Sequence, residues 1–237
     1  MYIMFYLVND KLKYIILCYP KSGCTVLRLL HIYLENYDNI NIIKSPNFED
    51  KHHSNSQYVN FNYKKEYDSY YKVIVYRDPY ERICSTFYQK VCGIISNNVT
   101  QRNKLIKQPK RLTKNLCNFD QWLNIFIKES HSDIHFKPQK KNNFKYDEII
   151  EISNINKLFE KNAFLNKLAN EMLDKYNLNN RNSLIKYSLP EYRDLSNYDF
   201  HVDSNHLLKD NKVPDYKYLL NENTIKKIKN DYNDDFL

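Results

Sequence analysis

The chain has 237 residues, of which 42% are hydrophobic and 27% charged, a composition typical of one globular domain with a sizeable core. Lysine and arginine (36) outnumber aspartate and glutamate (28), and the formal charge of +8 suits an anionic partner: a nucleotide, a nucleic acid, an acidic glycan or a membrane. The five cysteines are scattered and form no CxxC pair, which argues against a disulfide framework or zinc site and favours a reducing compartment.

The chain opens with an apolar run, from Tyr2 to Val8, that is too short to span a bilayer. It also lacks the basic start and the small-residue cleavage site of a signal peptide. We expect this run to form a strand that turns at Asn9-Asp10 into a second, buried strand, "KLKYIILCY". With no signal peptide or transmembrane anchor in the sequence, we expect a cytoplasmic protein, although a truncated Golgi protein would look the same.

A short loop, "PKSGCT", follows the second strand, and after Thr25 the apolar residues recur at helical spacing. A strand, a glycine-containing loop and a helix often bind phosphate, because successive backbone N–H groups and the helix N-terminus face the anion. The loop is no Walker motif, since GxxxxGK[ST] is absent and Lys21 precedes Gly23. Taken alone, it fits an ordinary strand-to-helix turn equally well.

The segment "YKVIVYRDPYERICSTFYQKV" repeats this order, with a buried strand at 73–76. Asp78 is a good N-cap and Pro79 a good first residue for a helix. Arg77, at the end of the strand, is well placed for a phosphate, unless it pairs with a neighbouring carboxylate. Ser85, on the second helical turn, either reaches the same anion or is a buried helix hydroxyl.

Further along the chain, "FDQWLNIFIKES" predicts an amphipathic helix, and the clearest of the later helices runs from Ile155 to Tyr176. Residues 38–71 are polar and irregular. The strand–helix units predict an α/β fold with a central, mainly parallel sheet flanked by helices, in a single domain spanning residues 1–237.

These two motifs resemble the cofactor motifs of sulfotransferases. "YPKSGCT" is similar to their 5′-phosphosulfate loop, and "YRDPYERICSTFYQK" to their 3′-phosphate motif, in the RDPxERxxSxF form of the Golgi carbohydrate sulfotransferases that act on chondroitin and dermatan. Four later segments resemble that family in order: "NFDQWLNIFI", "HFKPQ", "YDEIIEISNI" and "DYNDDFL".

The resemblance implies a P-loop NTPase-like sulfotransferase fold. It also implies transfer of a sulfuryl group from 3′-phosphoadenosine 5′-phosphosulfate (PAPS) to a hydroxyl acceptor, a glycan by analogy, with no metal. Lys21 would stabilise the leaving phosphate, and Arg77 and Ser85 would hold the 3′-phosphate. The residues expected to hold the 5′ end are Lys21, Ser22, Gly23, Cys24 and Thr25.

The acceptor hydroxyl needs a base, and histidine suits that role at neutral pH. "SPNFEDKHHS" resembles the SPxxxKTH stretch of cytosolic sulfotransferases, whose histidine is the base, and this match favours His53. The alternatives are two solvated loop histidines, or a carboxylate base such as Glu49 or Asp50. The residues that we expect near the substrate are Lys51, His52 and His135.

Two other functions compete with this interpretation. A P-loop-like small-molecule kinase would use ATP and Mg²⁺, but the Walker lysine after glycine is absent. A basic nucleic-acid-binding protein is suggested by the charge and the 22 tyrosines. Those tyrosines are spread over the whole chain, including expected core faces, so we expect no nucleic-acid partner. The basic run at 102–114 is either a solvated face or a guide for an acidic glycan.

Overall fold

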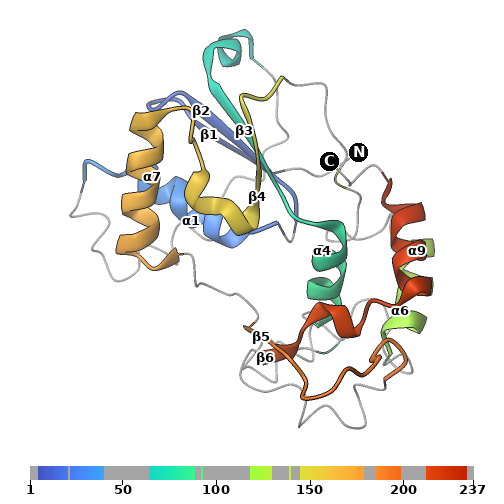
Figure 1. Ribbon diagram of the computed structural model, residues 1–237. Coiled ribbons are helices and arrows are strands. Elements are labelled where there is room, and N and C mark those ends of the chain that lie inside the picture. Colours follow the sequence, from blue (N-terminus) through green and yellow to red (C-terminus); the bar gives the residue numbers. More distant parts are fainter. Residues whose placement is uncertain are drawn as a thin grey trace, which may run out of the picture. The chain divides into compact units, whose positions relative to one another are not determined.

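The computed structural model describes residues 5–20, 22–39, 64–88, 92, 118–129, 139, 145–178, 185–198 and 212–233. They group into two compact units, each drawn in Figure 1 with its labelled elements. The first unit comprises Met1–Arg77 and Lys141–Arg181, and the second comprises Asp78–Lys140 and Asn182–Leu237. The single-domain organisation expected for the chain stays a prediction.

The first unit is built on a four-stranded sheet with the order β1-β2-β3-β4 (Figure 1). Strand β1 (Phe5–Asn9) runs antiparallel to β2 (Tyr14–Cys18), as predicted from the apolar start of the chain. Strands β3 (Tyr71–Tyr76) and β4 (Glu148–Glu151) continue the sheet in parallel. The prediction of a mixed α/β fold with a mainly parallel sheet is therefore confirmed.

Both faces of β2 are buried, which explains its continuous apolar run. On one face, helix α1 (Cys24–Glu35) packs against β1 and against helix α7 (Ala163–Lys175). Between these helices, the rings of Tyr33 and Tyr176 stack with centroids 3.8 Å apart. On the other face, Ile15 contacts tyrosines from the 3₁₀ helix η1 (Lys65–Ser69) and the residue that follows it.

The later part of this unit differs from the prediction of one helix from Ile155 to Tyr176. A 3₁₀ helix, η3 (Ile152–Lys157), follows β4 directly, and Phe159 then adopts a left-handed conformation with φ of 64°. Few non-glycine residues take this conformation, and it interrupts the helix. Helix α7 begins only after Asn162, whose side chain caps it by accepting from the Leu165 N–H at 3.2 Å.

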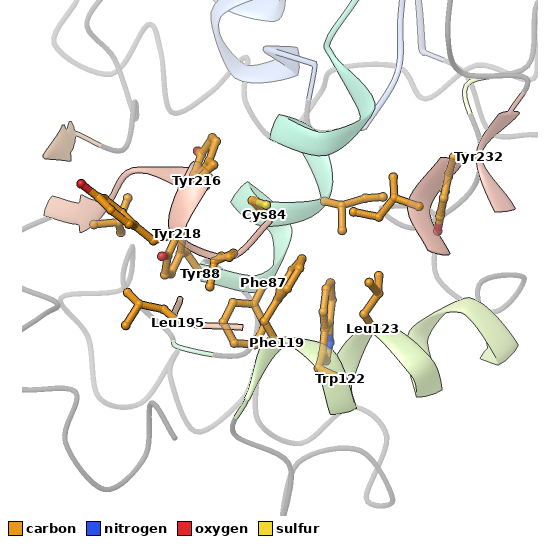
Figure 2. Packing of buried hydrophobic residues seen from close by; sticks show 14 residues of the cluster. Cys84, Phe87, Tyr88, Phe119, Trp122, Leu123, Leu195, Tyr216, Tyr218 and Tyr232 are labelled. Atoms are coloured by element: carbon orange, nitrogen blue, oxygen red, sulfur yellow. The ribbon is translucent and has the colours of Figure 1, made fainter. Parts of the chain in front are cut away.

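The second unit contains helices α4 (Pro79–Thr86), α6 (Phe119–Glu129) and α9 (Glu222–Asp231). A short parallel pair, β5 (Ile185–Tyr187) and β6 (Lys212–Pro214), precedes the 3₁₀ helix η5 (Tyr216–Tyr218). A core rich in aromatic side chains lies between the helices of this unit (Figure 2). In it, the ring centroid of Phe87 lies 5.2 Å from that of Phe119 and 5.3 Å from that of Trp122. The amphipathic helix predicted for "FDQWLNIFIKES" is confirmed as α6.

None of the described helices combines the length and the apolar character that crossing a membrane would need.

A chain of polar groups ties α1 to the sheet. Asn9 Nδ2 lies 3.5 Å from the Tyr14 hydroxyl, the Tyr14 hydroxyl shares a hydrogen bond with His31 Nδ1 at 2.9 Å, and His31 Nε2 lies 3.4 Å from Glu35 Oε1. Burial lowers the pKa of His31 from 6.5 to about 4, so the imidazole is neutral at pH 7. Burial also raises the pKa of Glu35.

His31 therefore makes folding sensitive to acid. Between pH 6.5 and 4 the unfolded chain binds a proton at this residue that the folded chain does not. The free energy of unfolding therefore decreases as the pH is lowered through this range. From pH 7 to pH 4, the free energy of unfolding of the wild type should fall by roughly 3 kcal/mol more than that of His31→Gln. Urea unfolding at several pH values measures both.

Glu35 acts in the opposite direction. Because its pKa is raised in the folded chain, its protonation at low pH increases the free energy of unfolding, and both proteins contain this residue. Its pKa is raised by burial and by Asp10, which both proteins keep, so most of its contribution cancels in the comparison. An equal loss of stability in the wild type and in His31→Gln would contradict the assignment.

Candidate functional site

The loop between β2 and α1 is a tight turn in the first unit. Strand β2 ends at Cys18, and the Ser22 N–H then donates to the Tyr19 carbonyl oxygen at 3.0 Å. Gly23 follows with φ of 80° and ψ of 21°, the left-handed conformation that glycine adopts at little cost. Its carbonyl accepts the Leu27 N–H at 3.0 Å, so α1 begins immediately after it.

Packing also disfavours a larger residue at this position. A Cβ atom on residue 23 would lie 2.3 Å from Cδ1 and 2.6 Å from Cγ1 of Ile152, the first residue of η3. Such distances are far shorter than any van der Waals contact, so the loop backbone lies directly against the Ile152 side chain. The loop is thus packed against the segment that follows β4.

The start of α1 has the properties of an anion site. Within the described residues no side chain caps this helix, and no acidic residue stands in its first turn. The first N–H groups of a helix have no intrahelical acceptor, and the helix dipole is positive at this end. An N-terminus of this kind, following a glycine turn, favours a bound phosphate or sulfate group.

Three side chains around the turn complete this part of the site. Ser22 is fully buried, and the Cys24 thiol donates to the Tyr19 carbonyl oxygen at 2.8 Å. Arg28, one turn into α1, donates from Nε to the Cys24 carbonyl oxygen at 3.3 Å. Arg28 is not among the predicted site residues, although its position four residues after Cys24 puts it on the same helical face.

Arg77 leaves the sheet at the same edge as this loop. Strands β2 and β3 are parallel neighbours, with Cys18 in register with Val75, and Arg77 follows the last residue of β3. Its side chain is half-buried. The carboxyl ends of adjacent parallel strands are a common place for ligand binding in α/β folds.

The second unit contains Ser85, on the second turn of α4. Asp78 and Pro79 begin this helix as predicted, with Asp78 Oδ1 accepting from the Glu81 N–H at 2.9 Å. The Glu81 carboxylate binds Lys186 Nζ at 2.7 Å. Ser85 is 2% exposed, a burial compatible with both roles considered for its hydroxyl.

Several predicted site residues lie outside the described part of the chain. They are Lys21, Lys51, His52, His53 and His135. Among the residues that are described, no group of three or more His, Cys, Asp or Glu side chains could hold a metal ion.

A comparison with known protein families identifies the family of the chain. The family model described as "Sulfotransferase family" matches residues 5–237, and the chain therefore belongs to the sulfotransferase family. No curated protein and no solved structure matches the chain significantly.

Substituting Gly23 tests the packing of the loop. Gly23→Ala should lower the free energy of unfolding by roughly 2–5 kcal/mol, because it combines left-handed strain of about 1–2 kcal/mol with overpacking of about 1–3 kcal/mol. Chemical denaturation measures the loss.

Shortening the opposing side chain provides the matched control. In an Ile152→Ala background, the cost of Gly23→Ala should fall to the backbone part, roughly 1–2 kcal/mol. A cost that is the same in both backgrounds would show that Ile152 does not constrain the loop.

Proposed function

We propose that the chain transfers a sulfuryl group from PAPS to a hydroxyl acceptor, and that the acceptor is a carbohydrate. Membership of the sulfotransferase family supports the reaction type. The observation that carries the donor assignment is the turn at Gly23. It leads directly into the N-terminus of α1, where no described side chain caps the first N–H groups, and such an N-terminus favours a bound phosphate.

The residues around this turn suit the 5′ end of the nucleotide. The backbone N–H groups of Gly23, Cys24 and Thr25, with the hydroxyl of Thr25, are donors of the type that binds phosphate and sulfate oxygens. Arg77 follows the neighbouring parallel strand, and a guanidinium suits the 3′-phosphate. The strand–loop–helix order and the mainly parallel sheet support a P-loop NTPase-like fold.

PAPS supplies the sulfuryl group when it is bound, and the remaining work falls to side chains of this chain. Transfer by in-line attack requires charge stabilisation at the leaving phosphate, and Lys21 is the proposed cation. The acceptor hydroxyl must lose a proton, and His53 is the proposed base, with Lys51 two residues before it in the sequence.

The carbohydrate acceptor rests on two weaker supports. The motif "RDPYERICSTF" is similar to the form found in carbohydrate sulfotransferases, and the charge of +8 suits an acidic glycan. Lys51, His52 and His135 remain the residues proposed to contact this acceptor.

The donor assignment predicts selective binding of adenosine 3′,5′-bisphosphate, the nucleotide product. At 100 times its Kd, a ligand that binds only the folded state stabilises it by about 2.7 kcal/mol. We expect a clear rise in Tm with the bisphosphate, and its loss in Arg77→Ala. Differential scanning fluorimetry measures both.

Arg193→Ala is the matched control, because Arg193 is exposed in the second unit with its guanidinium 5.1 Å from the Tyr198 ring. This variant should keep the full response. A rise in Tm with ADP and Mg²⁺ alone would contradict the proposal and favour a kinase instead.

The base assignment predicts a separation of catalysis from binding. His53→Ala should lower kcat roughly 10²–10⁴-fold, the range for loss of a general base, while the affinity for adenosine 3′,5′-bisphosphate stays unchanged. A sulfate-transfer assay, together with calorimetric titration, measures the two quantities.

His52→Ala provides the neighbouring control and should retain most of the turnover at saturating acceptor. If His53→Ala turns over as fast as the wild type, the base must be another group, and the carboxylates of Glu49 and Asp50 would be the next to test.

A further inference from the structure

A salt bridge in the second unit joins helix α4 to strand β5. Lys186 Nζ lies 2.7 Å from Glu81 Oε1, although the two residues are 105 positions apart in the sequence. The Lys186 ammonium also lies 4.8 Å from the centroid of the Tyr216 ring, which is buried in the core drawn in Figure 2. Lys186 is thus held by side chains from two other elements, α4 and η5.

The ammonium of Lys186 is charged at neutral pH. Partial burial lowers its pKa, but the hydrogen bond to the Glu81 carboxylate and the charge of that group raise it, and the net shift is upward. The Lys186 and Glu81 side chains are 38% and 35% exposed, and salt bridges as accessible as this one contribute little to stability. The main consequence of the pair is therefore the charge that it sets near the start of α4.

Glu81 stands close to Ser85, which is expected to hold the 3′-phosphate. It lies four residues before Ser85, so both residues are on the same face of α4, with Cβ atoms about 6 Å apart. The start of this helix already carries the Asp78 carboxylate, which caps it by accepting from the Glu81 N–H. A phosphate monoester carries roughly two negative charges at pH 7. A second carboxylate with no cation beside it would therefore repel a phosphate bound at Ser85.

We propose that Lys186 is a positioning residue for nucleotide binding: it neutralises Glu81 and so removes the repulsion between that carboxylate and the 3′-phosphate of the nucleotide. Lys186 acts through Glu81 and does not itself contact the phosphate. This inference rests on the function proposed above, and it adds a residue of β5 to those that the sequence motif supplies for the 3′-phosphate.

Removing the charge of Lys186 should cause a loss of affinity that depends on the 3′-phosphate. At a separation of about 7 Å in water, the repulsion between a carboxylate and a doubly charged phosphate corresponds to roughly a tenfold change in affinity. Lys186→Met should therefore bind adenosine 3′,5′-bisphosphate roughly tenfold more weakly than the wild type. Its affinity for adenosine 5′-monophosphate, which lacks the 3′-phosphate, should stay the same. Calorimetric titration of the whole protein measures both affinities.

A second substitution, at Glu81, separates this mechanism from direct contact. The double variant Lys186→Met/Glu81→Gln removes both charges, and it should regain the affinity of the wild type for adenosine 3′,5′-bisphosphate. Lys227→Met is the matched control, because Lys227 forms a salt bridge with Asp120 at 2.9 Å in the same unit. This variant should bind both nucleotides as the wild type does.

Full affinity for the bisphosphate in Lys186→Met would overturn the proposal. A double variant that binds as weakly as the single one would do the same, because Lys186 would then contact the phosphate directly. An equal loss of affinity for both nucleotides in Lys186→Met would also overturn it, since that result indicates a purely structural role. A wild type that binds neither nucleotide would refute the proposed function itself, and this inference with it.

Discussion

The contact between the Gly23 backbone and the Ile152 side chain is the constraint on which the site depends. A Cβ atom at residue 23 would clash with the Ile152 side chain, and Gly23 itself forms the left-handed turn from which α1 starts directly after β2. Because Ile152 follows β4, this contact joins the loop after β2 to the segment that leaves the edge strand of the sheet. The proposed phosphate site is therefore a property of the assembled first unit.

Local signals explain the parts of the fold that could be predicted from the sequence. Strand β2 is buried on both faces and gives an uninterrupted apolar run, which no amphipathic element would show. Asp78 and Pro79 define the start of α4 through a side-chain cap and a fixed φ angle, both of which act within one turn. Each of these features is encoded by neighbouring residues.

Other parts depend on tertiary contacts that the sequence does not display. Strand β4 has only four residues, and its Glu148 is buried because Oε1 accepts from the Tyr71 hydroxyl at 2.6 Å and from the Lys161 N–H. The left-handed Phe159 likewise breaks a helix that periodicity alone would continue. In the site, the spacing predicted a phosphate loop around Gly23. The contact with Ile152 does not follow from the motif, whereas the nearness of Arg28 follows only once α1 is known to begin at Cys24.

The central claim is that the Gly23 turn binds the nucleotide, and the chain's two glycines allow a direct test. Protein labelled with ¹⁵N only at glycine should give two backbone amide signals in an NMR spectrum, and a Gly93→Ala variant assigns them. Titration with adenosine 3′,5′-bisphosphate should move the Gly23 signal in a saturable way. A Gly23 signal that stays in place while calorimetry shows the nucleotide bound would contradict the account, because binding would then occur elsewhere.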